Sequence, residues 1–131
     1  MRSREAMQWE ETLKSVFDAI DAELEAEYGR NYSLHPSRPN RGVTANPEDD
    51  GLFNVGAAFS AGFGSEYGPG YVVEIRVATL KKVPETVREE IKKKVFQGLG
   101  NRLPKAFPGK ALHVSEENGL IRIHGDLSLD D

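Results

Sequence analysis

Two histidines and an aspartate near the end of the chain are the residues whose types and spacing first suggest chemistry. The dipeptide Asn118-Gly119 is the strongest short signal for a β-hairpin turn. If these are the two loop residues, His113 lies directly opposite His124, with the Cβ atoms about 5 Å apart. Asp126 follows His124 by two residues, so a continuous strand places it on the same face.

This trio allows two kinds of chemistry. Two imidazoles and a carboxylate match a two-histidine, one-carboxylate set for a divalent metal, and a histidine beside a carboxylate can act as an acid–base pair. Alternatively, the residues are polar side chains on the solvated face of an antiparallel sheet. Arg122 shares the predicted face, and its positive charge disfavours a cation there. No pattern names a cofactor or a reaction.

A second group of candidates surrounds a glycine-rich segment. Apolar residues alternate along the first strand of a hairpin predicted over residues 52–80, and we expect this phenylalanine-bearing face to be buried: Phe53, Val55, Ala57, Phe59, Ala61 and Phe63. The opposite face carries Asn54, Gly56 and Ser60, where backbone or a ligand can approach closely. Ser65 and Tyr67 lie in the connecting loop and complete this candidate ligand-binding set.

The glycine loop itself differs from known phosphate cradles. It runs from Gly62 to Gly70, has no P-loop lysine, and leads into a strand rather than into the N-terminus of a helix. The composition is typical of a folded hairpin loop.

Two arginines stand in a segment that lacks secondary-structure signals. Residues 30–50 contain three prolines and no apolar period, which predicts an arm along the surface. Arg38 and Arg41 in this arm present planar forks suited to carboxylate or phosphate. They could bind a ligand over the small-residue face of the first strand, or pair with the acidic first helix of a neighbouring subunit. We favour the second, because no other residue pattern marks a small-molecule site.

The elements that must position these residues form an α+β fold in the order α-β-β-α-β-β. Apolar residues three and four apart predict a helix over about residues 4–28, which Gly29 closes as a C′ glycine. A second amphipathic helix begins at Pro84 and runs to about residue 103, where Pro104 ends it. A last hairpin covers residues 111–129. We therefore expect one domain with a four-stranded, mainly antiparallel sheet and both helices packed on one face.

Charge is distributed unevenly along the 131 residues. The net charge is −4, but residues 5–27 hold eight acids and one base, while residues 76–110 hold ten bases and three acids. Such opposed charges can steer subunits together or hold helices side by side. The simpler interpretation, which we favour, is two ordinarily solvated helix faces. The absence of cysteine excludes disulfides, thiolate metal sites and a cysteine nucleophile.

These observations favour a non-enzymatic, homo-oligomeric binding or assembly module, because exposed sheet edges have to be covered or paired. The alternative is a small enzyme, or a protein that binds an anion or a metal through the arginine arm, the glycine loop and the His113–His124 face. Nucleic-acid binding by the basic second helix is a third hypothesis, opposed by the acidic pI and by the lack of interleaved aromatic residues. With no apolar leader or membrane span in the sequence, we expect a cytoplasmic protein.

Overall fold

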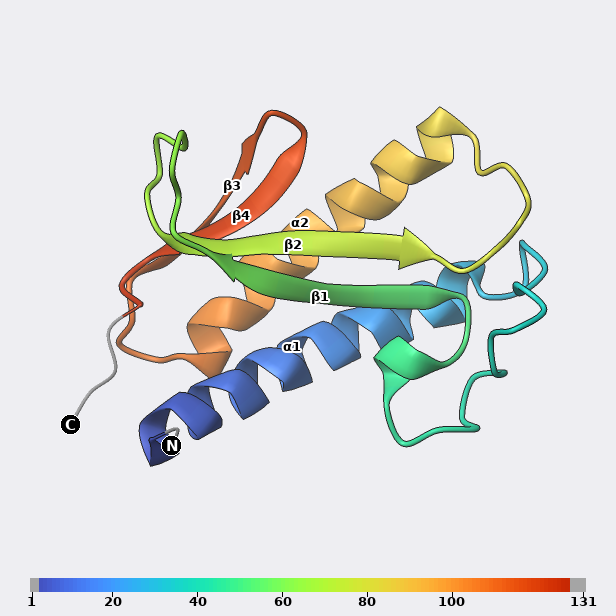
Figure 1. Ribbon diagram of the computed structural model, residues 1–131, viewed down its shortest axis with the longest axis horizontal. Helices are drawn as coiled ribbons and strands as arrows, with labels where there is room; N and C mark the ends of the chain where they lie inside the picture. The colour runs from blue at the N-terminus through green and yellow to red at the C-terminus, as the bar shows by residue number, and fades with distance from the viewer. Residues whose placement is uncertain (1–2, 128–131) are drawn as a thin grey trace.

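Two helices cover one face of a four-stranded antiparallel sheet in the computed structural model, which describes residues 3–127 (Figure 1). The predicted α+β class and the order α-β-β-α-β-β are confirmed. No helix within residues 3–127 has an apolar stretch long enough to cross a membrane. The elements are α1 (Arg4–Tyr28), a 3-10 helix η1 (Pro47–Asp49), β1 (Phe53–Ser60), β2 (Gly70–Val77), α2 (Glu85–Ala106), β3 (Leu112–Glu117) and β4 (Leu120–Gly125).

The strands lie in the order β1-β2-β4-β3, and the lengths of their pairings differ. β1 and β2 pair over eight residues, from Phe53 opposite Val77 to Ser60 opposite Gly70. β3 and β4 pair over six and place His113 opposite His124, as predicted. β2 and β4 pair only along the segment 70–72 of β2. The β3–β4 hairpin then diverges from β2 (Figure 1).

The core lies between the sheet and the two helices. Ser3 caps α1 by accepting a hydrogen bond from the backbone N–H of Ala6. The apolar stripe of α1 is buried as its spacing predicts, and Trp9 Nε1 donates to the Tyr71 hydroxyl on β2 at 2.9 Å. Gly98 lets the helices approach closely, because a Cβ there would lie 3.1 Å from Ile20 Cγ1.

Three local predictions need correction. α2 continues through Pro104 to Ala106, because a proline in the last turn removes only one helical bond, while Leu103 and Phe107 on either side are buried. Pro84 is the cap of this helix rather than its first residue. Gly29 keeps a right-handed conformation, with φ of −59°. Of the predicted hairpin over residues 111–129, the last two positions lie outside the described residues.

The phenylalanine-bearing face of β1 is buried only in its first half. Phe53 is fully buried, whereas Phe59 is 62% exposed and Phe63 is 96% exposed. β1 is an edge strand, and Phe59 keeps one aromatic neighbour, Tyr71, whose ring lies edge-on at 5.7 Å. The alternation along β1 correctly predicts which face of the strand points toward the helices, but it does not show how far along the strand the helices cover that face.

The opposed charges of the two helices meet within one chain. Arg102 on α2 pairs with Glu23 on α1, and Lys94 Nζ lies 3.1 Å from a carboxylate oxygen of Glu27. These pairs are partly exposed, so each contributes at most about 1 kcal/mol. The sequence favours solvated helix faces for this charge asymmetry, but some of the charges pair between the two helices and so help to hold them side by side.

Arg41 fixes the arm to the first helix of its own chain. Its guanidinium pairs with Asp21, lies 3.4 Å from Glu25 on α1, and donates to Asp50 at 3.2 Å. Asp21 and Asp50 are each 1% exposed. The predicted pairing with the acidic helix therefore occurs, but inside the chain rather than with a neighbouring subunit.

The two buried aspartates have pKa values shifted in opposite directions. Burial raises the pKa of Asp21 to about 6, although the hydrogen bond and charge of Arg41 act to lower it. Burial acts in the same direction on Asp50, but hydrogen bonds from Thr44 and Gly42 and the charge of Arg41 prevail and lower the pKa of Asp50. These bonds and the charge of Arg41 therefore favour the charged form of Asp50.

Replacing Arg41 with methionine should strongly destabilise the fold. The substitution leaves buried carboxylates without their cation, which typically costs about 3–5 kcal/mol. Urea unfolding followed by circular dichroism measures the loss. Arg30→Met is the matched control, because Arg30 is exposed on the same arm and should change stability by no more than about 0.5 kcal/mol. A loss below about 1 kcal/mol in R41M would contradict the anchoring role.

The Asp21→Asn variant should change the pH dependence of stability. The folded pKa of Asp21 is raised from 3.8 to about 6, so between these values the folded protein keeps a proton that the unfolded chain releases. The corresponding stability is fully present below pH 3.8 and is lost as the pH rises through about 6. The unfolding free energy of D21N, relative to the wild type, should therefore increase between pH 4 and pH 7. A constant or decreasing difference across that range would contradict the assignment.

Candidate functional site

Both predicted arginines of the arm bind groups of their own chain. Arg38 donates to four backbone carbonyl oxygens, those of Glu48, Asp50, Gly51 and Phe53, at 2.7–3.0 Å. Arg41 is held by the carboxylates of Asp21, Glu25 and Asp50. The structure thus places both guanidinium groups within the framework that supports the start of β1.

The glycine loop brings predicted residues from two hairpins together. The ring of Tyr67 stacks on the ring of His124, with centroids 4.4 Å apart, and His113 lies 5.5 Å from His124. Ser65 bonds to Glu117, and the backbone N–H of Glu66 donates to the same carboxylate at 3.0 Å. Gly62 is required for the fold of this loop, because a Cβ there would lie 2.1 Å from the Gly68 carbonyl. The loop therefore packs on the polar face of β3 and β4.

The surroundings of His124 favour its neutral form. Its Nε2 lies 2.8 Å from the Ser115 hydroxyl oxygen. Burial lowers the pKa of His124, and the charge of His113 acts in the same direction, while Glu117 acts against them. A neutral imidazole that stacks on Tyr67 and bonds to Ser115 anchors the loop, and it needs no ligand to do so.

The structure brings two members of the predicted metal set together. His113 and His124 are neighbours, but no group of three or more histidine, aspartate or glutamate side chains within residues 3–127 is placed to hold a metal ion. Gly125 has a φ of 113°, so the strand alternation assumed for Asp126 stops one residue before it. The backbone N–H of Asp126 bonds to the Ala111 carbonyl instead.

Asn54, Gly56 and Ser60 lie on the face of β1 that points away from the helices. The backbone groups along the free edge of β1 bear more directly on a possible interface. The Ala78 N–H donates to the Leu52 carbonyl, so the backbone N–H and C=O groups of the even-numbered residues of β1 bond to β2. The backbone N–H and C=O groups of the odd-numbered residues point away from β2, toward the free edge. Arg38 binds the outward carbonyl of Phe53, and the N–H of Val55 faces Asp21. The outward N–H and C=O groups of Ala57 and Phe59 lie farther along the strand than the groups that Arg38 and Asp21 cover.

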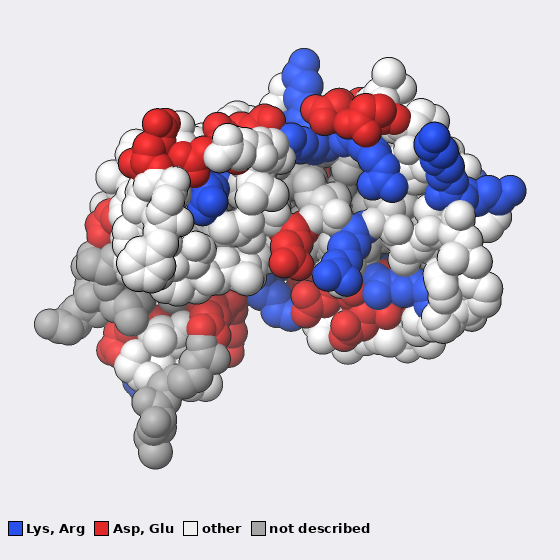
Figure 2. All heavy atoms as spheres, turned by 45° about the horizontal axis from the view of Figure 1, so that its top comes forward, with Lys and Arg blue, Asp and Glu red and all other residues white. Residues whose placement is uncertain are grey.

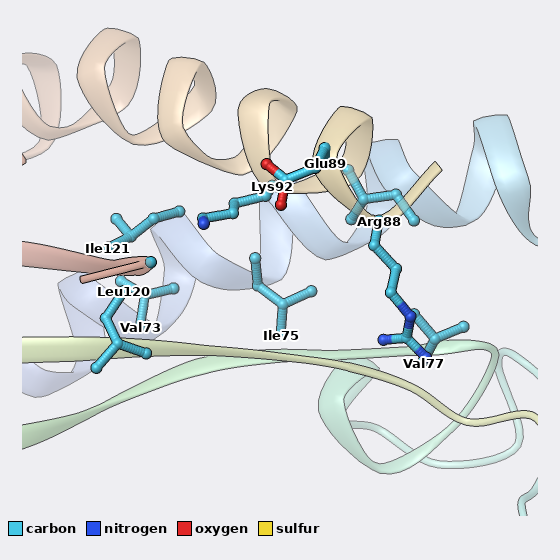
Figure 3. Close-up of a pocket in the computed structure, with 10 residues that line it drawn as sticks. Val73, Ile75, Val77, Arg88, Glu89, Lys92, Leu120 and Ile121 are labelled. Atoms are coloured by element: carbon cyan, nitrogen blue, oxygen red, sulfur yellow. The ribbon is translucent and has the colours of Figure 1, made fainter. Parts of the chain in front are cut away.

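Sequence reasoning missed a groove between β2, α2 and the turn that joins β3 to β4 (Figure 3). Its volume is about 220 Å³, and the space-filling view shows basic side chains bordering a hollow on this side of the molecule (Figure 2). Its lining is Val73, Ile75, Val77, Arg88, Glu89, Ile91, Lys92, Gly119, Leu120 and Ile121. The one available signal was the alternating run of valine and isoleucine in β2, a strand two residues longer than β4.

Comparisons with known proteins give a family for this fold. A family model described as "Uncharacterised protein" matches residues 4–125. A protein of Borreliella burgdorferi, described as "Uncharacterized protein", is 35% identical over 118 residues, which cover 90% of this chain and 92% of the relative. No solved structure matches the chain. These descriptions transfer no ligand, reaction or partner, so function has to be argued from the surfaces themselves.

The ring of His124 should titrate below its ordinary pKa of 6.5. An NMR titration of the His124 ring protons measures the midpoint. In Glu117→Gln the midpoint should fall further, because the carboxylate that favours the imidazolium is gone. In Tyr67→Ala it should rise toward the ordinary value, because the stacked ring no longer excludes water. A wild-type midpoint at or above 6.5 would refute the packed, neutral state.

Proposed function

We propose that this chain, which belongs to the family of uncharacterised proteins whose model covers residues 4–125, is a non-enzymatic assembly module that pairs with a second copy along β1. One observation carries the proposal: the outward backbone groups of Ala57 and Phe59 lie beyond the caps supplied by Arg38 and Asp21. Backbone groups at a sheet edge readily pair with another strand.

The composition of β1 supports this role. Natural edge strands are usually protected by charged residues, proline or a bulge. β1 contains none of these and pairs with β2 without interruption. β3, at the opposite edge of the sheet, ends with Glu116 and Glu117. The edge at β3 therefore carries charged residues that oppose pairing with another strand, and the edge at β1 does not.

A twofold axis at Ala58 gives a self-complementary arrangement. Antiparallel pairing about this axis sets Ala57 opposite Phe59 of the partner subunit, and Phe59 opposite the partner's Ala57. Each exposed phenylalanine then faces a small side chain beside a groove of about 400 Å³, which lies between α1 and β1 and includes Leu13, Phe17 and Tyr71. Large and small side chains thus alternate across the axis, and the apolar area of Phe59 leaves water.

The other hypotheses have less support. Three bases of α2 pair with acids inside the chain: Lys92 with Glu116, Lys94 with Glu27 and Arg102 with Glu23. This pairing reduces the charge available to nucleic acid. Ligand binding by the residues of the arm, the glycine loop or the histidine pair stays a prediction, as does the cytoplasmic location.

Sedimentation equilibrium tests the assembly directly. We expect a dimer in the wild type, and we expect Phe59→Lys to raise the dissociation constant roughly tenfold or more, about 1.4 kcal/mol. Ala57→Pro should act similarly, because it removes an outward N–H that the sheet itself does not use. Leu80→Lys is the matched control, since Leu80 is 74% exposed and lies outside the strand.

A monomeric wild type at all concentrations up to the solubility limit would overturn the proposal. So would a dimer whose dissociation constant is the same in the wild type, F59K and A57P. Circular dichroism spectra establish that each variant is folded before its mass is interpreted.

A further inference from the structure

β2 has a second free segment of backbone, on the side that faces away from β1. Even-numbered residues of β2 bond to β1, so odd-numbered ones direct their N–H and C=O groups toward β4. The register with β4 ends at Val72. The N–H and C=O of Ile75 and the N–H of Val77 therefore point into the groove, whereas the Val77 carbonyl accepts from Thr79 at 2.9 Å. Beyond Val72, β2 therefore has no partner strand on this side.

An apolar floor lies beside this free backbone. Val73, Ile91 and Ile121 are buried at the base of the groove, and Ile75 and Val77 are half-buried along its wall. Leu120, at the mouth, is 44% exposed. The cavity of about 220 Å³ accommodates an apolar side chain that projects from a strand paired with β2. In Figure 3, Arg88 and Lys92 extend from α2 toward the side of the groove formed by Val73, Ile75 and Val77 of β2.

Two bases of α2 line the groove. Arg88 and Lys92 lie one turn apart on α2 and both line the cavity. Arg88 also lines an adjacent hollow with Lys82 and Glu85. A hydrogen bond from Lys92 to Glu116 raises the pKa of Lys92, which keeps this amine charged. Arg88, Lys92 and Lys82 line the two cavities together with Glu85 and Glu89, and Glu116 pairs with Lys92. Arg88 and Lys82 are thus the bases that can face an acidic partner.

We propose that this groove binds an extended peptide segment in which apolar residues are followed by acidic ones. The segment adds as a strand to β2 through Ile75 and Val77, places one apolar side chain in the cavity, and sets its carboxylates against Arg88 and Lys82. This is β-strand addition, in which main-chain bonds supply affinity and pockets for alternate side chains supply specificity.

The binding surface is independent of the proposed dimer. The dimer uses the outer edge of β1, while the groove lies on the other side of β2, and β1 and β2 stay paired along their full length. A variant that fails to dimerise, such as Phe59→Lys, is therefore expected to bind peptide as the wild type does. Failure of one proposal leaves the other standing.

The test uses fluorescein-labelled heptapeptide pools of the pattern Thr-apolar-Thr-apolar-Thr-Asp-Asp, with valine, isoleucine or leucine at the apolar positions. Fluorescence anisotropy measures binding, and amide NMR shifts locate it. We expect shifts at residues 73–77, 88–92 and 119–121. A pool ending in two lysines, and a pool with N-methylated backbone on one edge of the strand, should each bind at least about fivefold more weakly.

Two variants of α2 sharpen the test. Arg88→Glu should weaken binding of the aspartate pool at least about fivefold. Lys93→Glu makes the same charge change at an exposed position of the same helix that does not line the groove, and it should have less than about a twofold effect. Three results would each overturn the proposal: no shifts at residues 73–77 at millimolar peptide, equal binding of the lysine or N-methylated pool, or shifts confined to the edge of β1.

Discussion

The pairing of Arg41 with Asp21, Glu25 and Asp50 is the interaction on which the rest of the structure depends. Two of these carboxylates are almost fully buried, and a charge in such a place is tolerated only when it is paired. The arm has no apolar stripe of its own and packs few residues into the core, so apolar burial alone does not fix its path. The guanidinium fixes that path by joining the arm to α1 and to the turn before β1.

From this anchor the edge of β1 is determined. Arg38 lies on the same arm, and its position allows it to bind the carbonyl oxygens that lead into β1, including the outward carbonyl of Phe53. Asp21, held by Arg41, faces the N–H of Val55. The cluster therefore protects the first half of an edge strand and leaves the second half unprotected. The side chains of Arg38 and Asp21 thus determine where the protected part of the β1 edge ends and the candidate interface begins.

Local signals allowed much of this fold to be predicted. The apolar stripe of α1 and the Asn118-Gly119 turn depend on neighbouring residues, and both the helix and the opposition of His113 and His124 follow from them. The roles of Arg41 and Tyr67 could not be found in that way. Their partners lie about 20 and about 57 residues away in the sequence, and no periodicity encodes a contact at such a distance. Phe59 illustrates the same limit. The alternation predicts which face of β1 the side chain lies on, but not whether a helix covers it there.

The groove beside β2 has a topological origin. β2 and β4 are separated by the whole of α2 and β3, so their register depends on how α2 packs rather than on a turn. β4 follows its own hairpin away from β2 (Figure 1). A groove lies between the last part of β2 and α2. The backbone of β2 is left unmatched at the point where α2 presents Arg88 and Lys92. A free strand edge, an apolar floor and a basic rim thus arise together from one feature, a strand that is longer than its partner.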